Sequence, residues 1–257
     1  MESSPAPWIE ALRNSHERLR GIVEPLGAGQ LGGPSYAKEW SVAQVLSHLG
    51  SGAEIFGLNL EAGLAGTQPP GQEQMAPIWA RWNAKGPEDQ AADALVADAA
   101  LVERLESLDA GQLASLRMAL FGMDVDATML ARMRLGEHAV HTWDIAVALD
   151  PAATIAPDAV ALLIDALAQV AGWTGKPDGA ERRIAVITHD PARHFVLETA
   201  DKVGLTESAG ESGPPELRLP AEAFIRLVYG RLDPAHTPAV DASGCDLDEL
   251  RAVFPGM

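Results

Sequence analysis

The spacing of apolar residues changes near the middle of the chain, and this change restricts the possible folds more than any other feature. Before residue 150, apolar residues recur every three or four positions, which is typical of amphipathic helices. After residue 180, the stretches "RIAVITHD" and "HFVLETA" are continuously apolar or alternate with polar residues, which is typical of strands. The sequence therefore predicts a helical first half and a mixed second half.

Helical spacing marks several stretches of the first half. They cover residues 8–23, 41–60, 89–108 and 126–149. Ser41 and Gln44 have the spacing of a capping box at the start of the second stretch. The apolar stripe of the third stretch is assigned to Leu95, Ala99, Val102 and Leu105. Four amphipathic helices predict an antiparallel four-helix bundle, with a loop over residues 63–74.

The segment "LDPAATIAPD", residues 149–158, separates the two halves because its prolines interrupt the helical pattern. It predicts a domain boundary, with one domain over 1–150 and another over 151–257. The second domain is predicted to be a small α+β unit. Its expected helices cover residues 159–173, 221–230 and 246–254, and its expected strands cover 183–190, 194–200, 203–208 and 216–220.

Charge narrows the possible partners. The formal net charge is −17 at pH 7, so the chain should be repelled by nucleic acids and by anionic lipid surfaces. We therefore expect neither nucleic acid nor membrane as a partner, and a small-molecule substrate instead. The most apolar helical window is interrupted by Asp158, Asp165 and Gln169, which argues against a membrane span.

Cysteine usage and the N-terminus indicate the compartment. Cys245 is the single cysteine, so no internal disulfide can form, which fits a reducing cytosol. The first residues lack the basic and apolar regions of a signal peptide. We expect a cytoplasmic protein, either a monomer or a homodimer. Cys245 lies in "ASGCDLD", where a loop or cap role is favoured over a catalytic one.

The stretch "GEHAVHTWD", residues 136–144, carries polar groups on an apolar helix face. At about 100° per residue, Glu137 and His141 share the face of Leu130 and Val140. Burial of a charge without a partner is costly, so these groups must be neutralised or must bind a ligand. A mutually hydrogen-bonded or solvated pair is the alternative interpretation.

His48 supplies a third group at the edge of the apolar arc of the second helix, and Gly52 leaves open space one turn later. His48, Glu137 and His141 would form a set of two histidines and one carboxylate. Helical bundles build metal sites from such inward side chains on facing helices. This donor set favours a divalent metal, with zinc as the leading candidate, and leaves a position open as catalytic sites do.

Two segments carry a family resemblance. "EWSVAQVLSHLG" resembles the Trp-x-Val-x-x-Val-Leu-x-His-Leu segment of DinB-like bundles, and "GEHAVHTWDIAVAL" resembles a Glu-x-x-x-His-x-Trp-Asp segment. Together they are similar to the maleylpyruvate isomerase family of mycothiol-dependent enzymes. The resemblance implies a DinB-like four-helix bundle followed by a small α+β domain resembling sterol-carrier proteins.

The same resemblance implies roles for particular residues. His48, Glu137 and His141 would ligate a metal, usually zinc, that activates the thiol of mycothiol, the small thiol of Actinobacteria. Arg231, in "LVYGRLDP", matches the family's Gly-Arg pattern and would be a catalytic arginine that recognises a carboxylate. An arginine that merely balances a helix end is the alternative. Asp144 either orients a ligand or forms a salt bridge with Arg134.

The function that the resemblance implies is a mycothiol-dependent, zinc-containing isomerase or thiol transferase. The partners would be a small-molecule thiol and an electrophilic or carboxylate-bearing substrate. The alternatives are a non-catalytic DinB-like protein that binds a metal or an apolar ligand, and a metal-dependent hydrolase. Four other histidines are interpreted as structural or solvated, with the first of them on a charged helix face: His16, His189, His194 and His236.

Limited proteolysis should cut the chain between residues 149 and 158, because linkers between domains are exposed and make few contacts. Mass spectrometry of the fragments identifies the cleavage sites. Cleavage confined to another segment, such as residues 66–74, with residues 149–158 resistant, would contradict two separable units.

Overall fold

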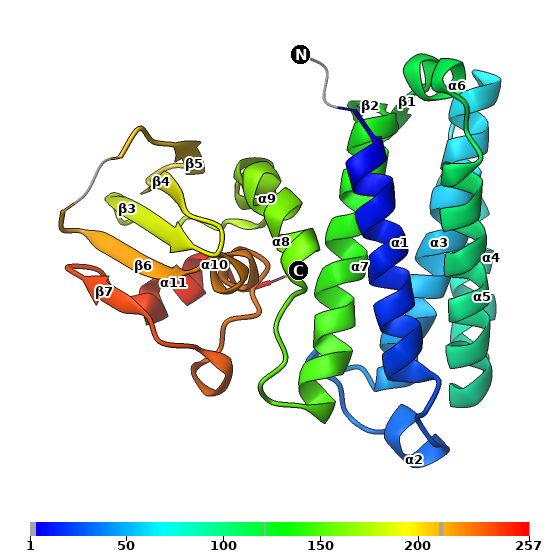
Figure 1. The fold of residues 1–257 in the computed structure, drawn as a ribbon, viewed down its shortest axis with the longest axis horizontal. Coiled ribbons are helices and arrows are strands. Elements are labelled where there is room, and N and C mark those ends of the chain that lie inside the picture. The colour runs from blue at the N-terminus through cyan, green and yellow to red at the C-terminus, as the bar shows by residue number, and fades with distance from the viewer. Residues whose placement is uncertain (1–3, 121, 211–212, 257) are drawn as a thin grey trace. The chain divides into compact units, whose positions relative to one another are not determined.

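The structure, a computed structural model, describes residues 4–120, 122–210 and 213–256 (Figure 1). The chain divides into two units, one ending at Ala153 and the other beginning at Thr154. The first unit is mainly helical, and the described part of the second combines helices with a five-stranded mixed sheet. The predicted fold class, a helical region followed by an α+β domain, is confirmed.

The first unit is built around long helices. Its elements are α1 (Ala6–Val23), α2 (Ala28–Leu31), α3 (Val42–Ala65), α4 (Gln72–Asn83), α5 (Pro87–Glu106), α6 (Ala110–Ser115), β1 (Arg117–Leu120), β2 (Met123–Asp126) and α7 (Ala127–Leu149). α3 packs most extensively on α5, and α1 packs on α7 and α5. The two strands form an antiparallel hairpin that leads directly into α7.

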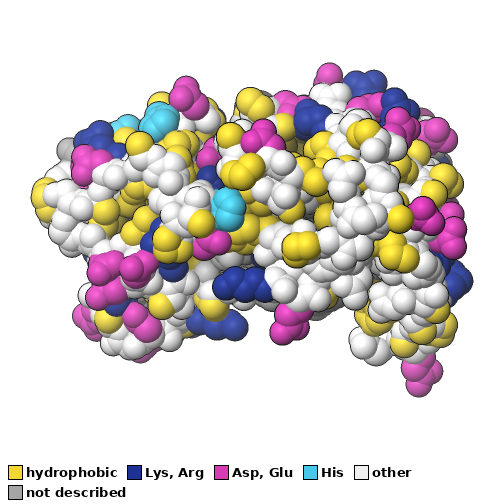
Figure 2. All heavy atoms as spheres, turned by 90° about the horizontal axis from the view of Figure 1, so that it is seen from below, with side chains coloured by type: hydrophobic (Ala, Val, Ile, Leu, Met, Phe, Trp, Pro, Cys, Tyr) yellow, Lys and Arg dark blue, Asp and Glu magenta, His cyan; other side chains and the backbone are white. Residues whose placement is uncertain are grey.

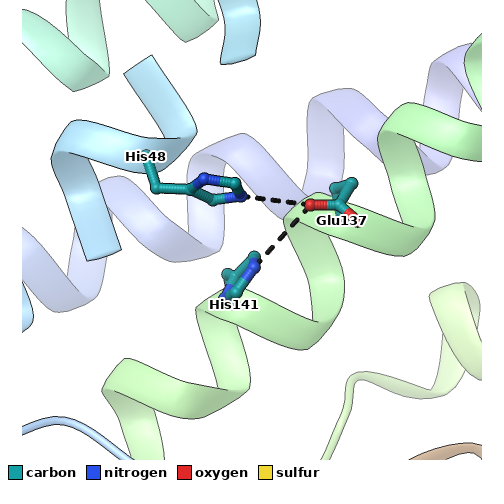
Figure 3. A group of neighbouring side chains, drawn as sticks. All are labelled: His48, Glu137 and His141. Carbon is teal, nitrogen blue, oxygen red and sulfur yellow. Dashed lines mark hydrogen bonds and ion pairs between the residues drawn. The ribbon is translucent and has the colours of Figure 1, made fainter. Parts of the chain in front are cut away.

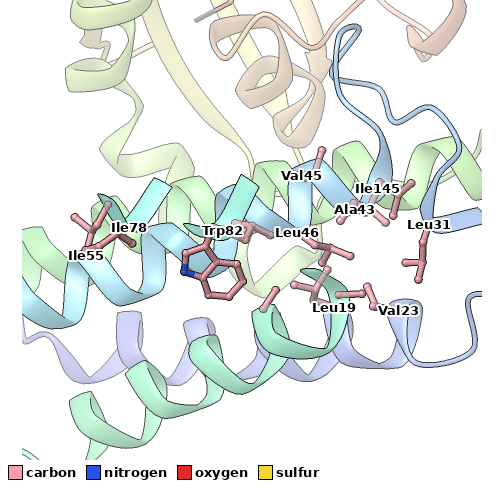
Figure 4. Packing of buried hydrophobic residues seen from close by; sticks show 14 residues of the cluster. Leu19, Val23, Leu31, Ala43, Val45, Leu46, Ile55, Ile78, Trp82 and Ile145 are labelled. Carbon is pink, nitrogen blue, oxygen red and sulfur yellow. The ribbon is translucent and has the colours of Figure 1, made fainter. Parts of the chain in front are cut away.

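Apolar side chains from several helices meet in the core of this unit (Figure 4). Each large aliphatic side chain that becomes fully buried contributes roughly 1.5–3 kcal/mol to folding. The cluster includes Leu19, Val23, Leu31, Val42, Val45, Leu46, Leu49, Ile55, Ile78, Trp82 and Ile145. It joins α1, α2, α3, α4, α5 and α7, so it fixes both helices on which the predicted metal ligands lie.

Caps fix where the two ligand-bearing helices begin. Ser41 Oγ accepts a hydrogen bond from the Gln44 amide at 3.2 Å, and Gln44 Oε1 accepts one from the Ser41 amide at 2.8 Å. This is the predicted capping box, which starts α3. Asp126 Oδ1 accepts a hydrogen bond from the Met129 amide at 2.7 Å and starts α7.

Parts of the first unit differ from the sequence predictions. The predicted loop over 63–74 is shorter, because α3 continues to Ala65 and α4 begins at Gln72. α4 itself and the β1–β2 hairpin were not predicted. The amphipathic pattern of α4 is interrupted by Pro77, and each strand of the hairpin has only 4 residues, so both signals were weak.

The second unit contains a sheet with the strand order β5-β4-β3-β6-β7. β3 pairs with β6 in parallel, whereas the other pairs are antiparallel. Its elements are α8 (Pro157–Leu163), η1 (Ile164–Ala166), α9 (Leu167–Thr174), β3 (Arg182–His189), β4 (Arg193–Thr199), β5 (Val203–Glu207), β6 (Glu216–Pro220), α10 (Ala221–Val228), η2 (Pro234–His236), β7 (Asp241–Ser243) and α11 (Leu247–Val253).

The predicted strands of the second unit coincide with β3 to β6, and the last two predicted helices coincide with α10 and α11. The single helix predicted over 159–173 is wrong in detail, because a 3-10 turn, η1, divides it into α8 and α9. The short edge strand β7 was not predicted. Its 3 residues are all exposed, so it lacks the apolar alternation on which strand prediction depends.

Charge on the surface is mixed in sign. Figure 2 shows acidic side chains interspersed with basic ones on one face, although the chain as a whole carries a formal charge of −17. Among the described residues, no helix combines the length and the apolar character needed to cross a bilayer.

Gly50 provides a test of the packing around α3. A Cβ atom added there would lie 2.3 Å from Trp82 Cη2 and 3.0 Å from the Cα of Ala94. We expect Gly50→Ala to lower the free energy of unfolding by about 1–3 kcal/mol, because the core is already filled. Gly57→Ala, on the same helix but with open space around it, should raise it by up to about 1 kcal/mol. Urea denaturation measures both, and equal effects would contradict the close approach.

Candidate metal centre

Three side chains converge between α3 and α7 (Figure 3). His48 comes from α3, whereas Glu137 and His141 lie one turn apart on α7. One potential ligand atom of each lies within 4.8 Å of the others. His48 Nε2 is 3.2 Å from Glu137 Oε2, and His141 Nε2 is 3.7 Å from the same oxygen. The structure therefore brings together the three residues that the sequence grouped.

The donor atoms and their separations fit a small divalent ion. In a tetrahedral zinc site with bonds of about 2.05 Å, ligand atoms lie about 3.3 Å apart, which is close to both separations from Glu137 Oε2. Two imidazole nitrogens and one carboxylate oxygen are also a donor set that zinc accepts. The His48, Glu137 and His141 side chains could therefore bind a metal.

Asp144 decides which nitrogen of His141 faces the group. The carboxylate of Asp144 is fully buried, and its Oδ2 lies 2.8 Å from His141 Nδ1. A carboxylate there accepts the Nδ1 proton, so the lone pair of His141 lies on Nε2, toward Glu137. The structure shows the contact with His141, which is the one expected of a residue that orients a ligand. Arg134 pairs with Asp98 instead.

Glu137 is ionised over most of the pH range. Burial acts to raise its pKa, but the hydrogen bond from His48 and the charges of His141, His48 and Arg134 lower it to about 2. One third of the side chain is exposed to solvent. The carboxylate is therefore negatively charged, as a metal ligand must be.

Trp40 lies on one side of the group. Its ring centroid is 5.1 Å from that of His48 and 6.2 Å from that of His141. The residue is 38% exposed, which is unusual for so large an apolar side chain. The indole therefore covers one side of both imidazoles.

A buried polar cluster lies deeper in the first unit. Asp98, on α5, places Oδ2 2.8 Å from His16 Nδ1 and 2.8 Å from His138 Nε2. Its Oδ1 accepts a hydrogen bond from Arg134 at 2.7 Å. The prediction that His16 occupies a charged helix face is wrong, because its side chain is buried against α5. Ser15 Oγ lies 2.8 Å from His138 Nδ1 and closes the cluster.

The charges in this cluster balance one another. Burial acts to raise the pKa of Asp98, but His138 and the Arg134 guanidinium hold it well below its usual range. Burial also lowers the pKa of His138, although the nearby Asp98 carboxylate acts to raise it. The cluster therefore contains a buried carboxylate paired with a buried guanidinium.

The cluster was not predicted because the first half of the stripe assigned to α5 was about one residue off, whereas Val102 and Leu105 are buried as predicted. Leu95 and Ala99, assigned to the stripe, are only half-buried. Asp98 continues a buried row at helical spacing, and that break in an apolar row was the available signal. The row consists of Ala94, Asp98, Leu101 and Leu105.

Other residues considered from the sequence lie elsewhere. Arg231 belongs to the second unit, follows α10, and donates from Nη1 to the Tyr229 carbonyl at 2.6 Å. Its catalytic role stays a prediction. Cys245 lies 3.4 Å from the Glu216 carbonyl oxygen through its Sγ, and burial raises its pKa, which disfavours a thiolate. His189 is exposed on β3.

The fold and the site together define a two-unit protein whose helical unit carries a possible metal site. A family model described as the mycothiol maleylpyruvate isomerase N-terminal domain matches residues 12–146. A second model, described as the MDMPI C-terminal domain, matches residues 154–250. The chain belongs to the mycothiol maleylpyruvate isomerase family, as its two helical segments predicted.

Solved structures agree with this assignment at the level of the fold. The chain is similar to the crystal structure of a mycothiol-dependent maleylpyruvate isomerase, with a TM-score of 0.68 over 91% of this chain and 92% of that one. A histidine-to-alanine mutant of a mycothiol-dependent maleylpyruvate isomerase gives a TM-score of 0.67 over 90% of each chain. Sequence identity is 14% in both cases. A comparison with curated protein sequences finds no match.

Acid titration of the metal-free protein tests the ionisation of Glu137. The folded pKa of about 2 lies below the ordinary value of 4.5, so the carboxylate stabilises the fold above pH 4.5. This stabilisation is lost as the pH falls from 4.5 through 2. Glu137→Gln removes the titrating group. The free energy of unfolding of this variant should therefore fall less steeply with decreasing pH than that of the wild type.

Urea denaturation at about pH 5.5 and about pH 3, with a chelator present, makes this comparison. Glu103→Gln, at an exposed position on α5, is the control for the loss of one carboxylate. Parallel pH dependence in the wild type and Glu137→Gln would contradict a depressed pKa at Glu137.

Proposed function

We propose that this protein is a metal-dependent enzyme of the maleylpyruvate isomerase type that activates a small thiol for isomerisation or thiol transfer. The observation that carries the proposal is the convergence of His48, Glu137 and His141 in a chain of this family. An ion-binding group of only three protein ligands leaves room for a further ligand, as catalytic sites do.

His48 Nε2, Glu137 Oε2 and His141 Nε2 are the proposed metal ligands. A zinc ion held by two neutral imidazoles and one carboxylate would keep a net positive charge and lower the pKa of a thiol at its open position. The contribution of this chain is to present the donors in the correct state. Asp144 holds the proton of His141 on Nδ1, and the local charges keep Glu137 ionised.

Solvent access supports a role in binding small molecules. The side chains of His48 and Glu137 are 38% and 33% exposed, so a ligand can reach them. Trp40 covers one side of His48 and His141, and so restricts water there while giving an entering molecule an apolar surface.

The thiol and substrate are proposed from the family. Mycothiol is the candidate thiol, and the second substrate would be an electrophilic or carboxylate-bearing small molecule. Arg231 is proposed to recognise that carboxylate, because a planar guanidinium binds carboxylates in bidentate fashion. Cys245 is not the proposed nucleophile, since burial raises the pKa of its thiol.

Metal analysis and thiol binding test the proposal together. Wild type purified from a metal-supplemented culture should hold about one divalent ion per chain by plasma mass spectrometry, and His48→Ala should hold far less. His189→Ala removes an exposed histidine outside the group and should retain the ion. Calorimetry at neutral pH should then give mycothiol binding that depends on the metal and releases about one proton.

The remaining outcomes separate the alternatives. Equal, substoichiometric metal in the wild type and His48→Ala would overturn the metal centre. A stoichiometric metal without affinity for mycothiol or a related thiol would overturn the thiol mechanism, in favour of a metal-dependent hydrolase or a non-catalytic binding protein. Cys245→Ser should bind the thiol as the wild type does.

A further inference from the structure

Arg134 connects the two helices that carry the proposed metal ligands. It lies on α7 one turn before Glu137, and it is 2% exposed. Its Nη2 donates a hydrogen bond to the carbonyl oxygen of Leu49 at 3.0 Å. Leu49 directly follows His48 on α3. A side chain of the helix that carries Glu137 and His141 therefore binds the backbone beside His48.

The way in which α3 and α7 pack on other helices makes the hydrogen bond from Arg134 to Leu49 important. α3 packs more extensively on α5 than on α7, and α7 packs more extensively on α1 than on α3. The separation of α3 and α7 near the group therefore depends on few direct contacts between them. The hydrogen bond from Arg134 to Leu49 is one such contact, next to a ligand.

The surroundings of the guanidinium are shaped to hold it. The same Nη2 donates to Asp98 Oδ1 at 2.7 Å, and Asp98 is 1% exposed. On α3, a Cβ atom at Gly52 would lie 3.1 Å from Arg134 Nη1. The space that Gly52 leaves beside His48, which the sequence suggested was open, is thus bordered by the guanidinium.

Stability alone gives a weak reason for such a cluster. Removal of a guanidinium and a carboxylate from water costs about as much as their attraction returns, so apolar replacements of similar volume are often no less stable. The ion pair of Arg134 and Asp98 instead defines where these two side chains lie. Asp98 Oδ2 also lies 2.8 Å from His16 Nδ1, with which it shares a hydrogen bond, and 2.8 Å from His138 Nε2; the two histidines come from α1 and α7.

We propose that Arg134, anchored by Asp98, is a positioning residue that sets the placement of His48 relative to Glu137 and His141. This inference rests on the metal centre proposed above. In this proposal Arg134 contacts neither the metal nor the substrate. Its effect on the ion is transmitted through the Leu49 backbone to His48.

Arg134→Lys tests this role because lysine keeps the positive charge but lacks the rigid planar guanidinium, whose Nη2 donates to both Leu49 and Asp98. We expect zinc affinity, measured by competition with a chromophoric chelator, to fall by roughly 10- to 100-fold, as for other residues that orient metal ligands. The visible spectrum of the cobalt-substituted protein should also change, since it reports ligand geometry. Asp98→Asn, which removes the anchor with little change of shape, should weaken zinc binding in the same direction.

Leu105→Ala is the control that distinguishes a loss of ligand positioning from a general loss of stability. Leu105 is buried on α5, seven residues from Asp98, so its truncation should lower the melting temperature without altering the cluster. We expect Leu105→Ala to keep zinc affinity within about twofold of the wild type. Equal losses of zinc affinity in Leu105→Ala and Arg134→Lys would overturn the positioning role, as would wild-type affinity in both Arg134→Lys and Asp98→Asn.

The wild type and His48→Ala, measured in the same assay, distinguish this result from failure of the proposed function. Zinc binding in the wild type that His48→Ala abolishes supports the metal centre on which the inference rests. If the wild type binds no zinc, the proposed function and this inference both fall. If it binds zinc and both Arg134→Lys and Asp98→Asn bind it equally well, only the positioning role falls.

Discussion

The placement of an ionised carboxylate between two packed helices is the constraint on which the rest of the first unit depends. Glu137 is partly withdrawn from water, so its charge requires compensation by His48, His141 and Arg134. These groups come from two helices, and their approach requires the loops, caps and apolar core that fix α3 and α7. The apolar contacts bring the helices together, whereas the polar contacts define where their side chains meet.

The polar residues of this unit form two connected levels. The outer level is the partly exposed group of His48, Glu137 and His141, and the inner level is the buried cluster around Asp98. Arg134 belongs to the inner level but lies on the same helix as two residues of the outer one. Membership of the mycothiol maleylpyruvate isomerase family agrees with a chemical role for the outer level. The inner level accounts for how a few polar contacts can hold that group in place within a largely apolar bundle.

The candidate group could be predicted because its members follow local rules. Glu137 and His141 are four residues apart, so helix geometry alone places them on one face. His48 follows a capping box that fixes the start of its helix. Asp98 was missed for a related reason, since the first half of the stripe assigned to α5 was about one residue off, and one residue corresponds to about 100° around the helix axis. Such a shift hides a buried charge among residues that look solvated.

The sequence by itself determined the helical and mixed halves, the capping box of α3 and the pairing of Glu137 with His141, because these depend on periodicity and on contacts within a few residues. The tertiary structure alone decided which partner each buried polar group has. Arg134 pairs with Asp98 and Leu49, and Asp144 with His141, although the sequence allowed Arg134 and Asp144 to pair with each other. The physical reason is that a buried charge requires a partner but does not specify which one. Helix packing makes that choice by bringing together residues that are far apart in the chain.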